Sequence, residues 1–188
     1  ATLDVQYVFL ETAERDRFSV GEYNQLIVQH QRYQPTDFNS SNVNVQLNFN
    51  HPVTELIWCV RRECHTQKNN LFNFSGKYGY DPVKSVGLTL NNLARWNEQL
   101  SGQYFRLVQP YQHCTNIPAS FIYLFSFCLD TSQVAVQPSG SMNMSRVDTV
   151  HLNLKLADDL GKFTLFVFCR NYNILQFSSG LAGVRFAN

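Results

Sequence analysis

The residues of this sequence best suited to metal binding are two adjacent cysteine–histidine pairs. Cys64 precedes His65, and His113 precedes Cys114. Structural zinc sites usually combine two ligand pairs with CxxC or HxxxH spacing. Neither pair has that spacing, and the other histidines are scattered: His30, His51 and His151. The sequence therefore predicts no metal ion, and nothing in it points to another cofactor.

Cys64 is also the best candidate for a reactive nucleophile. It follows Arg61 and Arg62 and precedes His65, and positive neighbours lower the pKa of a thiol and favour the nucleophilic thiolate. Covalent catalysis also needs a base and a third group that orients the base. No such set is identifiable, so an ordinary cysteine at the end of a strand is the favoured interpretation.

Other catalytic signatures are missing or are better explained by turns. The sequence has no GxSxG elbow and no phosphate loop of the GxxxxGK[ST] or GxGxxG kind. Ser139 and Ser141 flank a glycine in a predicted turn before a strand. Asp158 and Asp159 form a carboxylate pair, but they lie in a predicted hairpin turn, where side chains are normally solvated. We therefore predict that the protein is not an enzyme.

The cysteines do not form a disulfide framework. There are five of them, an odd number without paired spacing: Cys59, Cys64, Cys114, Cys128 and Cys169. Cys59, Cys128 and Cys169 lie inside apolar runs, where cysteine behaves as a small core residue. This usage favours a reducing compartment.

Three Asn-x-Ser sequons are candidate glycosylation sites, and they begin at Asn39, Asn73 and Asn143. The first two lie in predicted loops, which acceptor sites require. Short sequons also arise by chance in a chain rich in asparagine. If the protein is made in the cytoplasm, we expect the secretory machinery to leave them unmodified.

An aromatic loop is the strongest candidate for a binding surface. Residues 71–80 read LFNFSGKYGY, with four aromatic side chains: Phe72, Phe74, Tyr78 and Tyr80. A carbohydrate-binding surface would use such residues, and so would a contact between subunits, because Tyr and Phe are enriched in interface cores. We favour the contact between subunits.

The composition excludes some functions. Of the 188 residues, 44% are hydrophobic and only 15% are charged, which argues against disorder. The net charge of +1 offers no field for capturing nucleic acid. No apolar run is long enough to span a membrane, and no signal peptide opens the chain. Because the chain starts at Ala1 inside a strand pattern and without Met, we expect a fragment or a processed product.

Period-two alternation predicts several half-buried strands. It is cleanest over residues 42–49, and it recurs over residues 3–9, 86–90 and 150–156. The runs 121–129 and 163–169 are apolar on both faces, which is typical of central strands. The remaining expectations are strands over residues 23–33 and 55–62, one or two helical turns over 11–22, a loop over 35–41 and long connections over 69–82 and 97–118, the last with a helical turn near 101–107.

These elements predict an all-β protein with about eight strands, long loops and little helix. Many short strands with polar turns indicate a sandwich or a barrel. Eight strands with long crossing loops favour a jelly-roll β-sandwich. We expect residues 1–188 to form one such domain.

Four segments, in order, resemble the second jelly roll of the major capsid proteins of nucleocytoplasmic large DNA viruses, the double jelly-roll family. Residues 1–18 are similar to the strand and charged segment that open that domain. Residues 47–58 (LNFNHPVTELIW) resemble its HPVKELIW strand, and residues 137–148 (QPSGSMNMSRVD) its PSGxxNxSRxD segment. Residues 171–183, with NYNIL and GLAG, resemble its closing tail. Two residues depart from the family pattern: Thr54 lies where Lys is common, and Gln176 lies where Arg is common.

The resemblance implies a structural protein, of which this chain is the second, C-terminal jelly roll of two. It implies a homotrimer that forms a pseudo-hexagonal capsomer of an icosahedral shell. Its partners would be neighbouring capsomers, minor capsid proteins and, through other proteins, an internal viral membrane, with no direct nucleic acid contact. The protein would be assembled in the host cytoplasm and reside in the virion capsid.

Three alternatives remain open from the sequence. A carbohydrate-binding jelly-roll module would be monomeric and would bind glycans through Phe72 or Tyr78. A minor capsid component would share the fold but consist of a single sandwich. A cupin-like enzyme would need clustered His and Glu ligands, with His51 and His151 as the residues to test, and no such cluster is visible.

Overall fold

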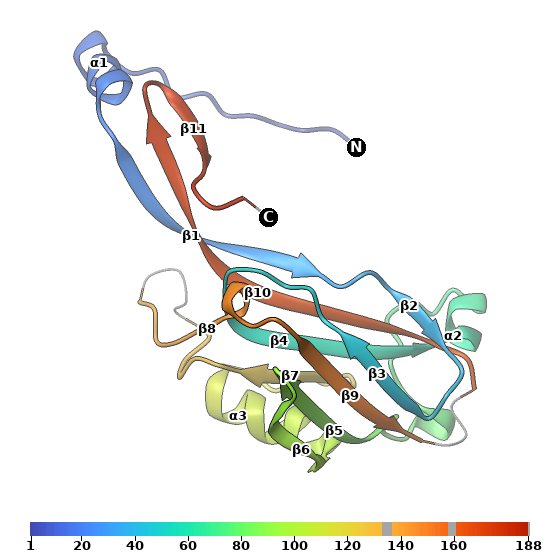
Figure 1. The fold of residues 1–188 in the computed structure, drawn as a ribbon. Helices are drawn as coiled ribbons and strands as arrows, with labels where there is room; N and C mark the ends of the chain where they lie inside the picture. Colours follow the sequence, from blue (N-terminus) through green and yellow to red (C-terminus); the bar gives the residue numbers. More distant parts are fainter. Residues whose placement is uncertain (133–136, 158–160, 188) are drawn as a thin grey trace. The chain divides into compact units, whose positions relative to one another are not determined.

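A computed structural model describes residues 1–132, 137–157 and 161–187 of the chain (Figure 1). The chain divides into two compact units. The larger unit is Val28–Tyr172, and the smaller unit combines Ala1–Ile27 with Asn173–Asn188. Strands β1 and β10 each run through both units, so the two units share continuous backbone.

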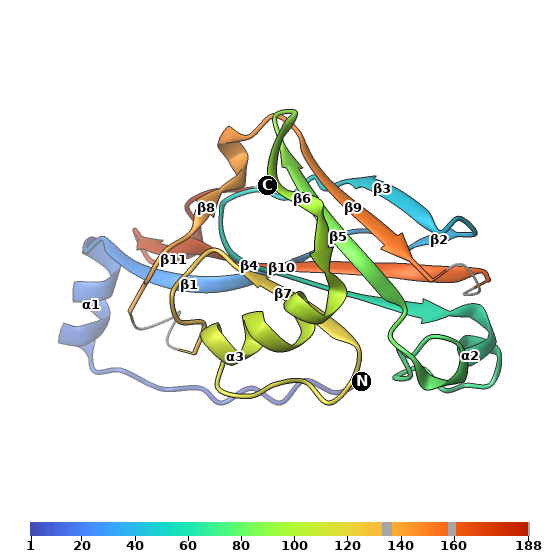
Figure 2. The same ribbon diagram turned by 90° about the horizontal axis from the view of Figure 1, so that it is seen from below.

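The described residues form two antiparallel sheets of seven and four strands, and eight of these strands make up the main strand orders (Figure 2). They are β1 (Tyr23–Arg32), β3 (Asn42–Gln46), β4 (Pro52–Arg62), β5 (Val83–Leu90), β6 (Leu93–Ser101), β7 (Ile122–Ser126), β9 (Val150–Leu156) and β10 (Phe163–Ser178). One sheet has the order β1-β10-β4-β7 and the other β3-β9-β5-β6. When these eight strands are numbered in chain order, the first sheet has the order 1-8-3-6 and the second has the order 2-7-4-5. This is jelly-roll topology, so the predicted fold class is confirmed.

Shorter elements complete the fold. β2 (Thr36–Phe38) and β11 (Leu181–Val184) pair with β10, and β8 (Met142–Asn143) pairs with β4. The helices are α1 (Thr12–Val20), α2 (Glu63–Gln67) and α3 (Gln109–His113), with a π-helical turn at Tyr104–Val108 and 3-10 turns at Lys77–Gly79 and Met144–Arg146. No helix in the described part of the chain is both long and apolar enough to cross a membrane.

Alternating side chains from both sheets build the core of the larger unit. Val43 and Val45 of β3 are buried, while their polar neighbours face outward. Leu152 and Leu154 of β9 follow the same pattern. The alternation works because successive side chains of a strand point to opposite faces of the sheet.

Trp58 lies at the centre of an aromatic cluster in this core. Its side chain is fully buried on β4 and stacks on Tyr123 of β7 with ring centroids 6.0 Å apart. Phe105, from the π-helical turn, packs on Trp58 at 5.3 Å. Aromatic contacts at such distances add to the stabilisation that burial provides. The cluster therefore joins the middle of one sheet to the segment between β6 and β7.

The smaller unit contains a tight hairpin. Ser178 pairs with Leu181, so β10 and β11 are joined by Ser179 and Gly180 alone. Both joining residues have positive φ, 51° and 73°, as the favoured two-residue hairpin turn requires. The Gln176 amide donates a hydrogen bond to Glu22 (3.1 Å), which ties this hairpin to the chain near the start of β1.

Most of the sequence-based expectations for individual elements are confirmed. Helix α1 ends at Gly21, whose N–H donates to the Arg17 carbonyl oxygen, as the charged stretch and its glycine predict. The strands predicted over residues 23–33, 42–49, 55–62, 86–90, 150–156 and 163–169 are present, although β3 ends at Gln46 and β10 extends to Ser178. The predicted turn at Asp158 and Asp159 lies outside the described residues.

Four expectations are wrong. Residues 3–9 form no strand and lie exposed, because nothing in the described chain pairs with them. Residues 36–38 form β2, although a loop was expected there. The run at 121–129 contains β7, which lies at the end of its sheet path and not in its centre. Its second apolar face is explained by the helical segment 104–113, which packs on β7.

The fourth error is β6, which lies where the sequence shows no period. Its pairing with β5 shifts register twice, between Val86 and Leu88 and between Leu88 and Thr89. Each shift adds residues on β6, because a β-bulge places extra residues opposite a single partner. The bulges destroy the period-two pattern that identifies a strand in a sequence.

We expect the core to be far more sensitive than the adjacent surface. Replacing buried Leu154 with Ala should lower the free energy of unfolding by about 3 kcal/mol, because it removes buried methyl groups and leaves a cavity. The neighbouring change Lys155→Ala, at an exposed position, should alter it by less than about 0.5 kcal/mol. Urea denaturation measures both, and similar losses for the two variants would contradict the assigned register of β9.

Candidate functional site

The aromatic loop connects α2 to β5 and displays three of its four aromatic side chains to solvent. Phe72, Tyr78 and Tyr80 are 85%, 81% and 73% exposed. Phe74 is half-buried, so it turns partly toward the protein. The structure thus places the predicted site residues in one loop, with three of them available to a partner.

Hydrogen bonds hold the first part of this loop. The Arg61 guanidinium donates to the Leu71 carbonyl oxygen (3.3 Å), and His65 Nδ1 lies 3.0 Å from the Asn73 carbonyl oxygen. Asn73 Oδ1 accepts from the backbone N–H and the hydroxyl of Ser75 (3.0 and 2.7 Å). Arg61 and His65, which the sequence offered as activators of a nucleophilic Cys64, therefore bond to the loop backbone instead.

A glycine closes the middle of the loop. The Gly76 N–H donates to the Tyr80 carbonyl oxygen at 2.8 Å. A Cβ atom at Gly76 would lie 2.9 Å from that oxygen, closer than side chains tolerate. Tyr78, between these residues, has a φ of 58°, a conformation that non-glycine residues adopt only when their surroundings hold it.

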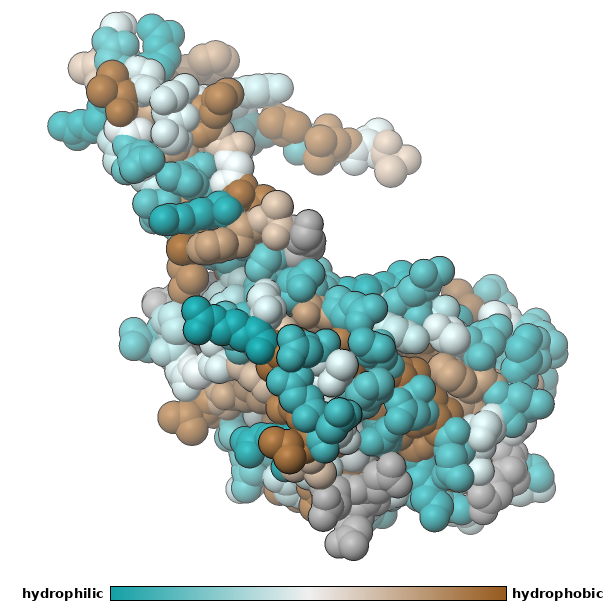
Figure 3. All heavy atoms as spheres, in the orientation of Figure 1, coloured by the Kyte–Doolittle hydropathy of each residue, from teal (hydrophilic) through white to brown (hydrophobic). Residues whose placement is uncertain are grey.

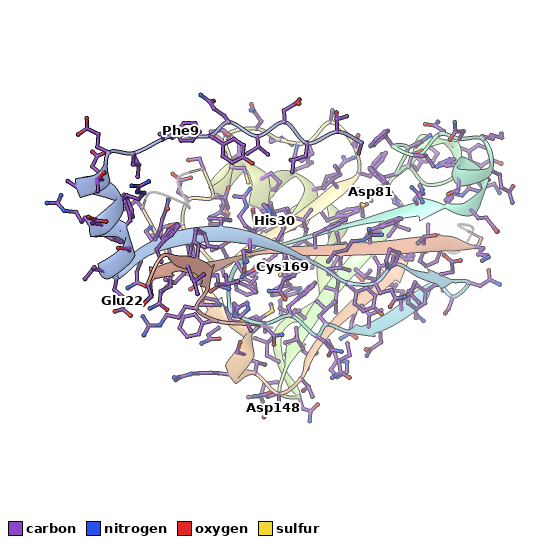
Figure 4. The ribbon with its side chains drawn as sticks, turned by 90° about the horizontal axis from the view of Figure 1, so that it is seen from above. Phe9, Glu22, His30, Asp81, Asp148 and Cys169 are labelled. Carbon is purple, nitrogen blue, oxygen red and sulfur yellow. The ribbon has the colours of Figure 1, made fainter. Side chains whose placement is uncertain are left out.

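Asp81 anchors the end of the loop to the core, where β5 begins (Figure 4). One carboxylate oxygen accepts hydrogen bonds from the Tyr123 hydroxyl and from the Val83 N–H. The other lies 3.6 Å from Nε of Arg106. Burial, together with the negative charge of Asp81, raises the pKa of Tyr123, so its hydroxyl stays protonated and keeps donating. Because Tyr123 also stacks on Trp58, the loop is attached directly to the central aromatic cluster.

An anchored loop is well suited to binding. Ordering a flexible segment on association costs free energy, and a segment that is already held in place avoids most of that cost. The aromatic side chains also lose few rotamers when they are covered. The loop can therefore contribute apolar contact area to a partner without first having to fold.

The sequence analysis missed a buried ion pair in the same unit. Glu55 of β4 is 1% exposed, and one of its oxygens lies 2.9 Å from Nε of Arg170 on β10. Arg170 also donates to the Thr131 carbonyl oxygen at 3.0 Å. Burial raises the pKa of Glu55, and the charge of Arg170 only partly opposes that shift. The sequence does show a single carboxylate, Glu55, within an apolar strand, which is a sign of a buried charge. Its partner Arg170 lies 115 positions away, and only the register of β4 and β10 brings the two together.

Several cysteines and histidines are buried or hydrogen-bonded within the fold. Cys59 and Cys169 are buried, and burial raises the pKa of each thiol to about 12, which keeps it protonated and unreactive. Cys114 accepts a hydrogen bond from the Thr131 hydroxyl (3.2 Å), and His113 Nδ1 lies 2.9 Å from the Leu129 carbonyl oxygen. Within the described ranges, no three His, Cys, Asp or Glu side chains gather in a way that could hold a metal ion.

The three sequon asparagines differ in accessibility. Asn39 is exposed in the connection between β2 and β3. Asn73 is half-buried, with its side chain engaged by Ser75. Asn143 is exposed on β8, and its side-chain oxygen accepts from the Ser145 N–H at 3.1 Å. The geometry therefore favours Asn39 as an acceptor.

Comparison with known proteins identifies the family. A family model described as "Large eukaryotic DNA virus major capsid protein" matches residues 14–183. The whole chain aligns at 35% identity with the major capsid protein of Pyramimonas orientalis virus, of which it covers 49%. At 30% identity, 98% of the chain aligns with 53% of the major capsid protein of Paramecium bursaria Chlorella virus 1. The chain thus spans about half the length of these relatives.

Solved structures agree with these matches. In the quasi-atomic model of the PBCV-1 virus capsid, one chain superimposes with a TM-score of 0.75 at 26% identity, over 97% of this chain and 56% of that one. The Faustovirus major capsid protein matches at a TM-score of 0.74 and 13% identity, over 90% and 36% of the two chains, which shows a shared fold alone.

The strand order and these matches define the protein as a jelly roll of the viral capsid class. The chain belongs to the family of large eukaryotic DNA virus major capsid proteins. The resemblance of the sequence to this family of capsid proteins is thereby confirmed.

The anchor of the aromatic loop can be tested at Tyr123. Tyr123→Phe removes the hydroxyl that donates to Asp81 and should lower the free energy of unfolding by about 2 kcal/mol, the usual worth of a hydrogen bond to a charged group. Amide hydrogens of residues 76–83 should exchange faster in this variant. The matched change Tyr111→Phe, on an exposed side chain, should leave both quantities unchanged. Equal behaviour of the two variants would contradict the anchoring role.

The Glu55 carboxyl should make stability depend on pH. Because its pKa is raised in the folded protein, the folded state binds more protons than the unfolded state above the ordinary glutamate pKa of about 4.3. Its contribution to stability is therefore greatest below that pH and is lost as the pH rises through the folded-state pKa. Urea denaturation between acidic and neutral pH should show this fall in the wild type relative to Glu55→Gln. The raised pKa would be contradicted if the free energy of unfolding of the wild type, relative to that of Glu55→Gln, stayed constant or increased with pH.

Proposed function

We propose that the full-length protein is the major structural subunit of an icosahedral viral shell and that this chain is the second, C-terminal jelly roll of two. The family match over residues 14–183 is the observation that carries the proposal. The coverage of 49% and 53% of two capsid relatives supports a second module of similar size in the whole protein. Its proposed role is structural: it acts through contacts between subunits and not through catalysis.

The proposed assembly unit is a homotrimer. Three copies of a protein with two sandwiches place six sandwiches in a ring, which gives a pseudo-hexagonal capsomer. Heterologous contacts between sandwiches can close such a ring. The net charge of +1 suits the dense packing of many copies, because self-repulsion is small.

The proposed partners follow from this assembly. Capsomers contact neighbouring capsomers and minor capsid proteins, and other proteins link the shell to an internal viral membrane. The protein resides in the virion capsid after assembly in the host cytoplasm, without touching nucleic acid directly. A glycan on an asparagine would be carried best by Asn39, which is exposed in a loop.

We assign the aromatic loop to the contact between subunits. Phe72, Tyr78 and Tyr80 leave most of their aromatic surface in contact with solvent. Aromatic side chains are typical of the fully buried centre of an interface, where a few residues carry most of the binding free energy. The hydrogen bonds of the loop keep these side chains presented before a partner arrives.

The full-length protein should be a trimer in solution, and substitution of the loop should dissociate it. Changing Phe72, Tyr78 and Tyr80 together to Ser should weaken trimer association by roughly 100-fold or more, since truncation of a buried aromatic anchor costs about 2 kcal/mol or more. Tyr111→Ser, which alters an aromatic residue that is 77% exposed on α3, is the matched control. Light scattering coupled to size-exclusion chromatography measures the association state of the loop variant and of the control variant.

Two results would overturn parts of this proposal. A monomeric wild-type protein that binds glycans, and loses that affinity in the loop variant, would favour a carbohydrate-binding module. A stable trimer that is unaffected by the loop variant would keep the capsid role but remove the loop from the interface.

A further inference from the structure

A cavity of about 720 Å³ opens at one edge of the sandwich, within the larger unit. The end of β1, the connection to β2 and β2 itself form one wall through residues 32–37. Asn48 and Phe49, which follow β3, and Thr164 of β10 complete the lining. In Figure 3, the face that carries β2 and β3 is mainly hydrophilic, with hydrophobic residues visible between the polar ones. None of the lining residues belongs to the aromatic loop, and the volume lies within the range of small-molecule sites.

Hydrogen bonds fix both walls of this cavity. The Gln31 side-chain amide donates to the Asn50 carbonyl oxygen (2.7 Å) and accepts from the Asn50 N–H (3.0 Å), which ties the end of β1 to the segment after β3. The Tyr33 N–H donates to the Val167 carbonyl oxygen at 2.8 Å, and β2 pairs with β10. A ligand therefore meets a preformed cavity, which lowers the free energy cost of ordering the protein on binding.

Three polar side chains of the lining are available to a ligand. Arg32, Gln34 and Asn48 are exposed, and within the described ranges none of these side chains makes a hydrogen bond or an ion pair. The Arg32 guanidinium lies 6.0 Å from the centre of the Phe166 ring, a contact that leaves its N–H groups unpaired. A guanidinium offers only donors, whereas each side-chain amide offers both donors and an acceptor. The cavity can therefore bond to groups that both accept and donate.

Asp37 supplies a strong acceptor and balances the charge of the cavity. Its carboxylate accepts from the Thr164 hydroxyl (2.7 Å) and lies 3.6 Å from Lys162 Nζ. The Thr164 bond lowers the pKa of Asp37, so the carboxylate stays ionised, and its two oxygens can accept further hydrogen bonds. Because Arg32 and Asp37 carry opposite charges, the lining as a whole is neutral. A strongly charged ligand such as phosphate would gain little from it.

Apolar groups lie beside these polar ones. Tyr33 and Pro35 are half-buried, and Phe49 is 6% exposed at the edge of the core. A saccharide has the complementary composition, since its hydroxyls both donate and accept while its C–H groups present an apolar surface. An extended peptide would instead be recognised mainly through the backbone of a strand edge. The unpaired polar groups identified in this cavity belong to side chains, which favours the saccharide.

We propose that this cavity binds a neutral saccharide unit. Arg32, Gln34 and Asn48 donate hydrogen bonds to its hydroxyls, and Asp37 accepts from them. The apolar surface of Tyr33 contacts its C–H groups. Because the cavity is open to solvent, we expect a modest dissociation constant of about 1 mM for a single saccharide unit. The inference concerns a different surface from the aromatic loop and does not depend on trimer formation.

Saturation-transfer difference NMR on the full-length protein tests the proposal. The ligands are the methyl glycosides of glucose, galactose and mannose, together with N-acetylglucosamine and, separately, inorganic phosphate. At least one saccharide should receive saturation, and phosphate should not displace it. Absence of binding by every saccharide up to about 50 mM would overturn the proposal. Displacement of the bound saccharide by phosphate would contradict a site for neutral ligands.

A matched pair of glutamine variants locates the bound saccharide. Gln34→Ala should weaken binding by roughly fivefold, the usual worth of one hydrogen bond. Gln46→Ala removes an exposed amide of β3 that does not line the cavity, and it should leave the affinity unchanged. Both side chains are exposed, so the free energy of unfolding should change little in either variant. Equal affinities of the two variants would overturn the assignment to this cavity.

The same samples separate this inference from the proposed function. A monomeric protein whose saccharide binding is weakened by Gln34→Ala would support the cavity and contradict the capsomer. Trimers that bind no saccharide would support the capsomer and overturn the cavity. Binding that is lost in the triple variant of the aromatic loop, but kept in Gln34→Ala, would place the saccharide on that loop and overturn the inference.

Discussion

The burial of Trp58 between the two sheets is the interaction on which the rest of the structure depends. Trp58 lies on β4, which pairs with β10 on one side and with β7 on the other. Its ring contacts Tyr123 and Phe105, so one side chain joins the sheet to the helical segment before β7. A fully buried aromatic cluster of this size contributes several kcal/mol of hydrophobic stabilisation, on the order of 2 kcal/mol for each ring. Strand β4 is therefore held by its two neighbouring strands and by the aromatic contacts of Trp58.

The aromatic loop acquires its conformation from that core. Tyr123 contacts Trp58 through its ring and Asp81 through its hydroxyl, so the same residue serves packing and anchoring. The Arg61 and His65 bonds at the other end make the loop a fixed part of the sandwich. A surface that binds a partner loses less free energy when its shape is set beforehand, and this loop has that property. Stability of the core and display of the surface are thus two consequences of one set of contacts.

Sequence patterns predicted what depends on local periodicity and missed what depends on distant partners. The alternation of residues 42–49 and 150–156 was sufficient to predict β3 and β9, because each of these strands has one face in the core. The bulges of β6 erased that signal. The strand predicted over residues 3–9 was wrong, because strand formation requires a partner and none of the described residues pairs with this segment. The pairings of Asp81 with Tyr123 and of Glu55 with Arg170 arise only from the folded register. The exposed aromatic loop was found because composition alone marks it.

The intact mass of the protein isolated from purified virus particles tests the central claim most directly. The claim is that this jelly roll is half of a two-module capsid subunit. The account predicts an abundant particle protein with a mass roughly twice the 21.7 kDa of this chain, or more, since the chain spans about half the length of its capsid relatives. A particle protein of 21.7 kDa would mean a single sandwich complete in itself and would contradict the account.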